Sequence, residues 1–256
     1  MLNFRTVTIL FIIACTGFFL LTFSMDISDW WLAAFGIIYL IFLIKGSASI
    51  SSDFYTTVHC GGITPEKKIA ITFDDGPTPF TKDILHTLAA YHVPATFFMI
   101  GKHIRGNEDI VKQVISNGHT IGNHTFSHSF FIDLKNTVAF KGELEQTDDA
   151  VHGITGKRLK LFRPPYGVTT PALARASKQL DYSLIGWNIR SLDTTTNSED
   201  VIFKRVTEQL KPGAIILFHD TSQKTNAVLK RVLEFAKEQD FIATQLEDLL
   251  KINAYR

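Results

Sequence analysis

The chain has 256 residues, with 26 Lys and Arg against 25 Asp and Glu, so its formal net charge at pH 7 is +1. This balance gives no electrostatic footprint for a polyanion, and we expect no nucleic-acid partner. The length suits one α/β domain of about 200 residues with a shorter appendage.

The appendage is predicted at the N-terminus. Residues 6–23 form an uncharged apolar run, close to the roughly 20 residues that a helix needs to cross a bilayer. Residues 30–44 form a second, shorter run, and Trp30, Trp31 and Lys45 at its ends are typical interfacial anchors. The two runs predict a helical hairpin that anchors the protein in a membrane.

Two other interpretations of this region stay open. Residues 1–24 have the length of a secretory signal peptide, but the cleavage signal is weak and a second apolar run follows. The residues that end at Cys15 resemble a lipobox, yet the run stays apolar after the cysteine, where lipidated proteins normally have a polar linker. The predicted domains are a membrane-anchoring region over 1–50, a linker over 51–66 and a soluble domain over 67–256.

From residue 69 onward, strand-like and helix-like stretches alternate. Strands are predicted over residues 69–73, 95–100, 119–122, 159–162, 183–188, 214–218 and 241–243, and helices over residues 82–91, 108–117, 136–155, 171–179, 200–210, 226–239 and 245–252. Such alternation predicts a parallel sheet with helices outside it. About seven units are too few for a complete eightfold barrel, so we expect an α/β fold with a distorted, incomplete (β/α) barrel.

The first polar cluster follows the first predicted strand. Asp74 and Asp75 end that strand, and Gly76 and Pro77 turn the chain. Carboxyl ends of strands are where α/β folds carry their chemistry. Two neighbouring carboxylates repel, so the pair needs a cation or a division of labour. Taken alone, the pair is equally consistent with an ordinary Asp-Gly turn.

A pair of histidines follows the third predicted strand. His124 and His128 are four residues apart, a spacing that places two side chains on one face of a helical turn, as in many metal sites. Surface histidines also show this spacing by chance. With Asp75 they make a set of two histidines and one carboxylate, which leaves coordination positions open for water and substrate.

Three more polar clusters follow later strands, over residues 162–167, 187–194 and 216–220. Taken singly, Arg163 and Asp193 are consistent with a structural ion pair at the barrel rim. His219 is equally consistent with a strand-end histidine bonded to backbone. Five such clusters at five strand ends are harder to explain one at a time, and they favour a single site at this edge.

In chain order, the motifs resemble those of the polysaccharide deacetylase family, the NodB-homology group also called carbohydrate esterase family 4. The matching stretches are TFDDGP at 72–77, HTFSH at 124–128, RPPY at 163–166 and LFHD at 217–220, and the resemblance extends over about residues 67–250. It implies a distorted barrel and a metal-dependent hydrolase. The substrate implied is an N-acetyl or O-acetyl group on a carbohydrate, such as a cell-envelope polysaccharide.

The resemblance also implies a metal centre and a base. Asp75, His124 and His128 would hold one divalent ion, usually Zn²⁺, with Co²⁺ or another divalent ion as alternatives. Asp74 would be the general base that activates water, and Arg163 would orient it and balance its charge. A guanidinium beside a carboxylate favours the ionised form, which agrees with that role.

The resemblance places the remaining roles on four residues. The backbone N–H of Tyr166 would bind the oxyanion, and Leu217 would line the acetyl pocket. His219 would be the general acid, tuned by Asp193, because a histidine held by a carboxylate has a raised pKa. These are the parts that amide hydrolysis requires: an oxyanion stabiliser and an acid for the leaving amine.

The fourth motif departs from the family pattern. Many members have Asp-x-x-Asp-Trp there, whereas this chain has Arg190 in the first acidic place and Thr194 in the aromatic one, and keeps Asp193. The tuning of His219 is therefore retained, but the shape of the acetyl-binding groove is not predicted by the resemblance. The substrate preference is expected to differ from that of peptidoglycan or chitin enzymes.

Three alternative functions follow from the same residues. The first is deacetylation or deformylation of a lipid-linked amino sugar, which the membrane hairpin favours. The second is a non-haem iron oxygenase, which would use the same donor set but would leave Asp74, Arg163 and His219 without roles. The third is an inactive sugar-binding module, which we would expect to have lost at least one of the acid, base or metal residues.

The predicted side of the membrane depends on which signal is followed. Two crossings place the N-terminus and the domain on one side, and Arg5 and Lys45 favour the cytoplasm for both. The family resemblance favours the outer face, because many members act on finished cell-wall polymer. We expect a protein of the bacterial inner membrane with its domain on the extracytoplasmic face, and a glycan or lipid-linked sugar as its partner.

Overall fold

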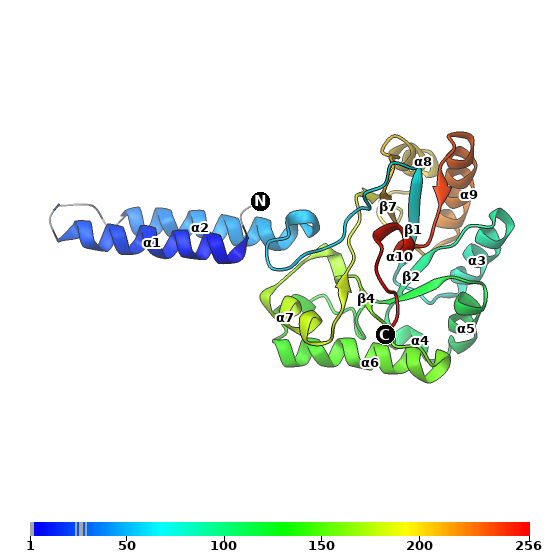
Figure 1. The fold of residues 1–256 in the computed structure, drawn as a ribbon, viewed down its shortest axis with the longest axis horizontal. Helices are drawn as coiled ribbons and strands as arrows, with labels where there is room; N and C mark the ends of the chain where they lie inside the picture. The colour runs from blue at the N-terminus through cyan, green and yellow to red at the C-terminus, as the bar shows by residue number, and fades with distance from the viewer. Residues whose placement is uncertain (1–2, 24, 26–27, 29) are drawn as a thin grey trace.

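The computed structural model describes residues 3–23, 25, 28 and 30–256. Two N-terminal helices, α1 (Phe4–Thr22) and α2 (Trp30–Ala48), lie side by side and project away from the rest of the chain (Figure 1). Both are long and apolar enough to cross a membrane. The rings of Phe11 and Tyr39 stack between them with centroids 4.4 Å apart. Residues 24, 26, 27 and 29, between the two predicted apolar runs, lie outside the described part.

The remaining chain alternates strands with helices, as the sequence predicts. The strands are β1 (Lys68–Asp74), β2 (Thr96–Met99), β3 (Thr120–Asn123), β4 (Leu161–Phe162), β5 (Ser183–Leu184), β6 (Ile189–Arg190), β7 (Ala214–His219) and β8 (Ile242–Ala243). The helices are α3 (Pro79–Tyr91), α4 (Gly101–Ile104), α5 (Glu108–Ser116), α6 (Thr137–Thr155), α7 (Pro171–Gln179), α8 (Glu199–Thr207), α9 (Gln223–Glu238) and α10 (Leu246–Leu250).

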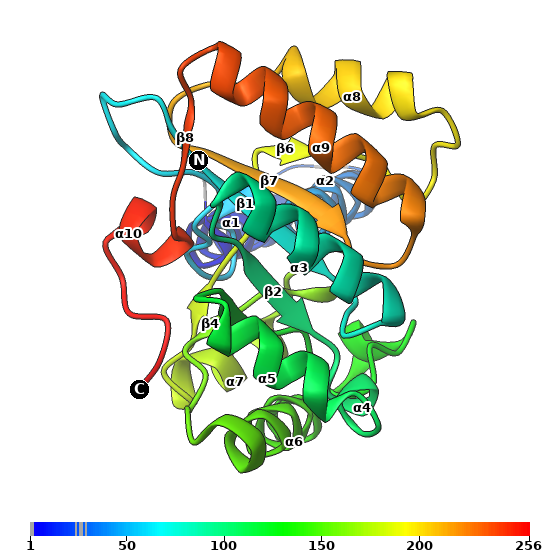
Figure 2. The ribbon, with the colours of Figure 1, turned by 90° about the vertical axis from the view of Figure 1, so that its right-hand side faces the viewer.

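All strand pairs are parallel, in the order β5-β4-β3-β2-β1-β7-β6, with β8 beside the start of β1. The strands curl, and helices α3, α5 and α9 cover the outer face of β1, β2 and β7 (Figure 2). Within the described residues, β5 and β6 do not pair with each other. The predicted incomplete (β/α) barrel is therefore confirmed.

The strand predicted over residues 183–188 is wrong in its second half. The chain leaves the sheet after Leu184 and re-enters it only at β6. The reason is that the segment before β1 lies in this gap: the His59 N–H donates to the Leu184 carbonyl, and the Gly186 N–H donates to the His59 carbonyl. Gly61 in turn forms a bridge to Ala214 at the start of β7. Residues far apart in sequence therefore fill the opening between β5 and β7.

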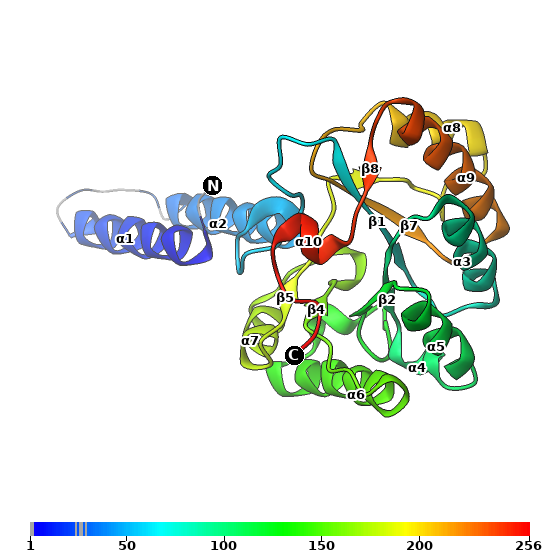
Figure 3. The ribbon, with the colours of Figure 1, turned by 45° about the vertical axis from the view of Figure 1, so that its right-hand side comes forward.

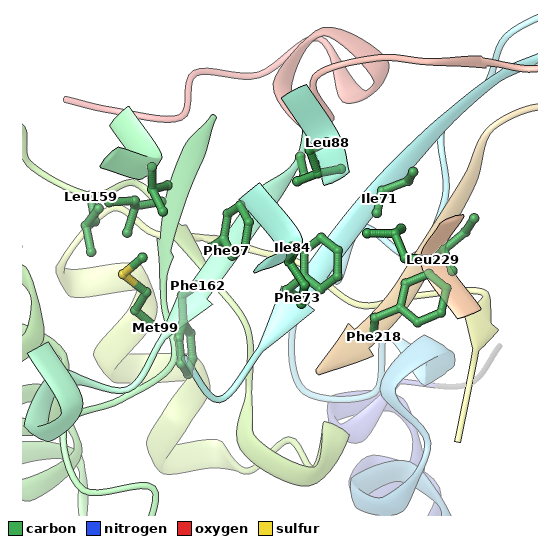
Figure 4. Packing of buried hydrophobic residues seen from close by; sticks show 14 of the residues in the cluster. Ile71, Phe73, Ile84, Leu88, Phe97, Met99, Leu159, Phe162, Phe218 and Leu229 are labelled. Atoms are coloured by element: carbon green, nitrogen blue, oxygen red, sulfur yellow. The ribbon is translucent and has the colours of Figure 1, made fainter. Parts of the chain in front are cut away.

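Side-chain alternation on β1 separates the core from the site. Ile71 and Phe73 point outward and pack with Phe97 under α3 and α9 (Figure 4). Thr72 and Asp74 alternate with them and point inward. Full burial of an aliphatic or aromatic side chain contributes about 1.5–3 kcal/mol, so the outer cluster fixes the register. That register places Asp74 on the concave face.

A second apolar cluster fills the base of the concave face. It contains Ala70, Phe98, Leu161, Ile185, Ile215, Leu246, Leu249 and Ala254. The last three come from α10 and the C-terminal tail, which lie on the side of the sheet away from α3 and α9 (Figure 3). The inner face is thus closed at the start of the strands, and its polar residues lie at the strand ends.

The base of the helical pair packs against the domain. The Thr169 N–H donates to the Ser47 carbonyl at 3.0 Å, and Ile50 is buried in the main core. Gly46 faces the ring of Phe54 so closely that a Cβ there would lie 2.3 Å from it. The predicted division into anchor, linker and soluble domain stays a prediction, but the segment that joins them is packed.

Candidate active site

The two carboxylates after β1 point to different partners. Asp74 is the last residue of β1 and is 3% exposed on the concave face. Asp75 has a φ of 76°, which is a left-handed conformation that is uncommon for residues other than glycine and turns the chain sharply. The following Gly76 has no room for a side chain, because a Cβ would lie 2.2 Å from the Asp220 carboxylate. The turn therefore separates two neighbouring carboxylates that have the same charge.

Asp74 is paired with a fully buried arginine from the end of β4. The Arg163 guanidinium donates to Asp74 Oδ1 at 2.8 Å, to Thr72 Oγ1 at 2.8 Å and to the Gly186 carbonyl at 2.9 Å. It also lies over the Phe98 ring, 4.1 Å from the centroid. Burial raises the pKa of the Asp74 carboxyl, and Arg163 opposes this rise. The predicted orientation of Asp74 by Arg163 has the required geometry.

His124 and His128 converge on Asp75. Asp75 Oδ1 lies 3.6 Å from His124 Nε2 and 3.5 Å from His128 Nε2. The four-residue spacing of the histidines does not come from a helical turn here, because residues 124–128 form an irregular loop. Left-handed conformations at Thr125 and His128, with φ of 65° and 46°, curl this loop. It is this curl that brings the two rings within 4.8 Å of each other.

The tautomer of His124 follows from its partner. Its Nδ1 lies 2.8 Å from the Arg163 carbonyl, which can only accept a hydrogen bond, so Nδ1 carries the proton. The lone pair of Nε2 then faces Asp75 and is free to bind a cation. Burial lowers the pKa of His124 to about 3 and also lowers the pKa of His128. Both imidazoles are therefore neutral at pH 7, as metal ligands must be.

The donor set fits a divalent metal ion. One ligand atom from each of Asp75, His124 and His128 lies within 4.8 Å of the others. Asp75 Oδ1 is buried and makes no hydrogen bond within the described residues. A buried carboxylate oxygen without a donor is costly, and a cation at this position would satisfy it. Two imidazoles and one carboxylate are a common zinc set with an open position.

On the other side of Asp74, a histidine and an aspartate form a second pair. His219 Nδ1 lies 2.7 Å from Asp193 Oδ1, and the His219 backbone N–H donates to Oδ2. Ser191 and Thr225 hydroxyls donate to the two oxygens of the same carboxylate. Burial lowers the pKa of His219, but the hydrogen bond to Asp193 and the charge of Asp193 raise it by more. The net result is a pKa above the ordinary value for histidine. The predicted tuning of His219 has this geometry.

The structure contradicts the two alternatives that the sequence left open for Arg163, Asp193 and His219. Arg163 pairs with Asp74 and Asp193 pairs with His219, so the two do not form an ion pair with each other. The side chain of His219 bonds a carboxylate rather than backbone.

The remaining predicted residues lie at the rim and the floor of the site. Tyr166 has a left-handed φ of 57° and its ring lies 4.8 Å from that of His128. Its side chain is 46% exposed, so it borders the opening. Leu217 on β7 is 2% exposed, and its neighbours Ile216 and Phe218 belong to the outer core cluster. Alternation therefore places Leu217 on the concave face, between Thr72 and Arg190.

Sequence reasoning missed the residues that hold the histidine loop and the β1 turn. Glu143 on α6 accepts hydrogen bonds from the N–H groups of Phe126 and Ser127, and Lys135 pairs with the same carboxylate. Asp220, beneath Gly76, accepts the Thr81 hydroxyl. Asp220 follows His219 directly, which is a usable signal, whereas Glu143 lies on an amphipathic helix where a surface carboxylate is the ordinary expectation.

Comparison with known proteins gives one family. Residues 61–185 match the model of the polysaccharide deacetylase family. The chain is 30% identical over 194 residues to the peptidoglycan-N-acetylmuramic acid deacetylase PdaA of Bacillus subtilis, covering 74% of this chain and 73% of that one. It is 34% identical over 200 residues to a peptidoglycan-N-acetylglucosamine deacetylase of Bacillus cereus, covering 73% of this chain and 89% of the relative.

The fold has close relatives among solved structures. A crystal structure of a peptidoglycan N-acetylglucosamine deacetylase superposes with a TM-score of 0.74 at 26% identity. The match covers 84% of this chain and 98% of that one.

Proposed function

This chain belongs to the polysaccharide deacetylase family, and from that premise we propose that it removes N-acetyl groups from a cell-envelope glycan with one divalent metal ion. The chain is accordingly classed as a deacetylase, a hydrolase of linear amides, like the relatives named above. The observation that carries the proposal is the convergence of a metal-ligand set with two separately paired titratable groups, Asp74 and His219, at one end of the sheet.

The metal centre is assigned to Asp75, His124 and His128. Once bound there, Zn²⁺, Co²⁺ or a similar ion would polarise the acetyl carbonyl and lower the pKa of water toward about 7. Asp75 and the two neutral histidines hold their donor atoms toward one point, and Tyr166 borders that point. The Tyr166 backbone N–H is assigned to the oxyanion, and Leu217 to the wall against the acetyl methyl group.

Asp74 takes the proton of the attacking water. Its Oδ1 is occupied by Arg163, so Oδ2 is the oxygen left to accept a proton, and it faces His124 Nε2 at 3.8 Å. The buried guanidinium fixes the carboxylate in this orientation throughout the reaction. A base held in this way usually contributes about 10²–10⁴ to the rate.

His219 completes the reaction. Its Nδ1 is bonded to Asp193, so the proton that it can give away is on Nε2. When the C–N bond breaks, that proton passes to the amine nitrogen, and the products are acetate and a free amino sugar. Asp193 stabilises the protonated imidazole, which keeps the acid protonated to a higher pH than in an unpaired histidine.

The proposal is tested by acetate release. The purified full-length protein should release acetate from N-acetylated glycan oligomers and from cell-wall fragments, and a metal chelator should abolish this. Full-length protein is preferred because Ile50, next to α2, is buried in the domain core. Metal-loaded protein that binds these oligomers but releases no acetate would instead favour an inactive sugar-binding module.

Metal content provides a second prediction. The protein should carry about one divalent ion, and His124→Ala or Asp75→Ala should weaken its binding by orders of magnitude, because each removes one of three ligands. The measurement is elemental analysis after dialysis against a metal buffer. His86→Ala, at an exposed position on α3, is the matched control and should keep the ion. Unchanged metal content in both ligand variants would refute the assignment.

We further propose that α1 and α2 anchor the protein in the membrane with the domain on the outer face. Both helices meet the domain at the same end: the Phe4 N–H bonds the Phe54 carbonyl near the start of α1, and Ser47 lies in the last turn of α2. Two crossings then keep the N-terminus and the domain on one side. The relatives named above act on peptidoglycan, which supports the outer side.

The topology prediction is read with reporter fusions. A phosphatase that is active only after export, fused after Arg256, should be active, and a reporter that is active only in the cytoplasm should be silent at the same position. The opposite pair of results would contradict the outer location and would favour a lipid-linked sugar precursor as substrate.

A further inference from the structure

A hollow lies beside the candidate active site, and we call it the arginine groove. Its volume is about 480 Å³, and it is bounded by the end of α2 and by the loops around β6. The lining residues that matter here are Ser49, Ser51, Tyr166, Trp187, Arg190 and Arg205. None of the described residues that line it is acidic. The groove includes Tyr166, which also borders the active site, so the groove and the site are neighbours.

Among the described residues, two guanidinium groups in this groove have no counterion. Arg190 and Arg205 are both exposed, and within the described part of the chain neither has a carboxylate within 4.0 Å. They are nevertheless held together, because Arg205 Nε donates to the Arg190 carbonyl at 2.8 Å. The Arg190 guanidinium also lies 5.7 Å from the centroid of the Trp187 ring, which restricts its position. The groove therefore presents two positive charges from fixed backbone positions.

The groove is continuous with the metal-ligand residues. The Tyr166 ring lies 4.8 Å from that of His128. The next residue, Gly167, touches Trp187, since a Cβ there would lie 2.7 Å from the indole. The Arg190 guanidinium in turn lies over the ring of Trp187. A glycan that leaves the active site across Tyr166 thus meets an aromatic surface and then the two arginines.

We propose that the arginine groove is a subsite for an anionic group on the glycan, a carboxylate or a phosphate carried by a sugar next to the one that is deacetylated. The fork of N–H donors on a guanidinium matches the oxygens of either group, and no acidic side chain in the groove competes for it. Arg190 also stands where many members of the family have an acid, so the sign of the charge is reversed there. This inference deepens the proposed function and rests on it.

The test compares three N-acetylated oligomers of equal length: neutral, with carboxylate ethers, and with phosphate esters. We expect kcat/KM of the full-length protein to be at least about tenfold higher for an anionic oligomer than for the neutral one, as expected for a charge-assisted hydrogen bond. Arg190→Gln and Arg205→Gln should each reduce this ratio by lowering the value for the anionic oligomer alone. The better of the two anionic oligomers identifies the group.

Arg175→Gln is the matched control. Arg175 on α7 is exposed and lacks a carboxylate partner in the described residues, but it lies outside the groove. Its loss removes the same charge and should leave the ratio unchanged. A ratio near one in the wild-type protein, or a ratio that falls equally in all three variants, would overturn the subsite.

A binding measurement separates this inference from the proposed function. Calorimetric titration with the deacetylated forms of the three oligomers needs no turnover. Tighter binding of an anionic product, weakened by Arg190→Gln and Arg205→Gln but not by Arg175→Gln, supports the subsite even if no acetate is released. Equal binding of the neutral and anionic products overturns it even if the protein proves to be an active deacetylase.

Discussion

Asp74→Asn should lower kcat by about 10²–10⁴-fold while the protein still binds one divalent ion. Asparagine keeps the shape of the side chain and an oxygen for Arg163, but it cannot accept a proton from water. Asp74 is not among the three residues whose donor atoms converge on the metal position. The measurements are steady-state kinetics and metal content on the same preparation.

The same substitution should also reduce stability. Arg163 is fully buried, and Asp74 is its only carboxylate partner within the described residues. Removing one member of a buried ion pair usually costs about 3–5 kcal/mol, because the remaining charge stays buried. Thermal unfolding should therefore show a lower midpoint, and the kinetics must be measured at a temperature where the variant is folded.

Asp75→Asn is the matched control, since it makes the same chemical change one residue away. Asp75 has no buried arginine partner within the described residues, and its neutralisation relieves repulsion between neighbouring carboxylates. We expect this variant to lose the metal but to keep most of its thermal stability when metal-free proteins are compared. Loss of metal from Asp74→Asn, together with an active Asp75→Asn enzyme, would exchange the two assignments.

These two variants also show how far the sequence leads. The strand before the carboxylates can be predicted, because the run from Ile69 to Phe73 is mostly β-branched and aromatic. Gly76, shortly after the run, indicates where the strand must have ended. The order of the motifs then indicates the family and the incomplete barrel. What the sequence does not reveal is the left-handed turn at Asp75, which sends adjacent side chains to different partners. That conformation depends on the tertiary contact between Gly76 and Asp220.

The histidine loop makes the same point. A spacing of four residues favours a helical turn, but Glu143 binds two backbone N–H groups of the loop and competes with helical bonds. The residue that decides the loop conformation is thus on another element. Local patterns and the family resemblance predict which residues gather at the site, and that Asp193 holds His219. The tautomers and the exposure of these residues are set by partners distant in the sequence that neither predicts, such as the Arg163 carbonyl for His124.

Asp193→Asn should move the alkaline limb of the kcat/KM profile to lower pH. In the wild-type protein the pKa of His219 is raised by Asp193, so the imidazole stays protonated to a higher pH than an ordinary histidine, and activity is lost as pH rises through that pKa. Without the Asp193 charge, burial becomes the main influence and lowers the pKa of His219. The protonated fraction at pH 7 then falls, and so does the rate.

The fall in rate caused by Asp193→Asn cannot exceed the fall caused by removing the acid, His219, itself. His219→Ala should lower kcat by about 10²–10⁴-fold, with metal content unchanged, and should abolish the alkaline limb that belongs to His219. Asp200→Asn, an exposed carboxylate on α8 whose partner is Arg231, removes the same charge and should leave the profile in place. An alkaline limb that stays fixed or moves to higher pH in Asp193→Asn would show that His219 is not the acid. In that case the buried pair would serve only to join β7 to the loop after β6.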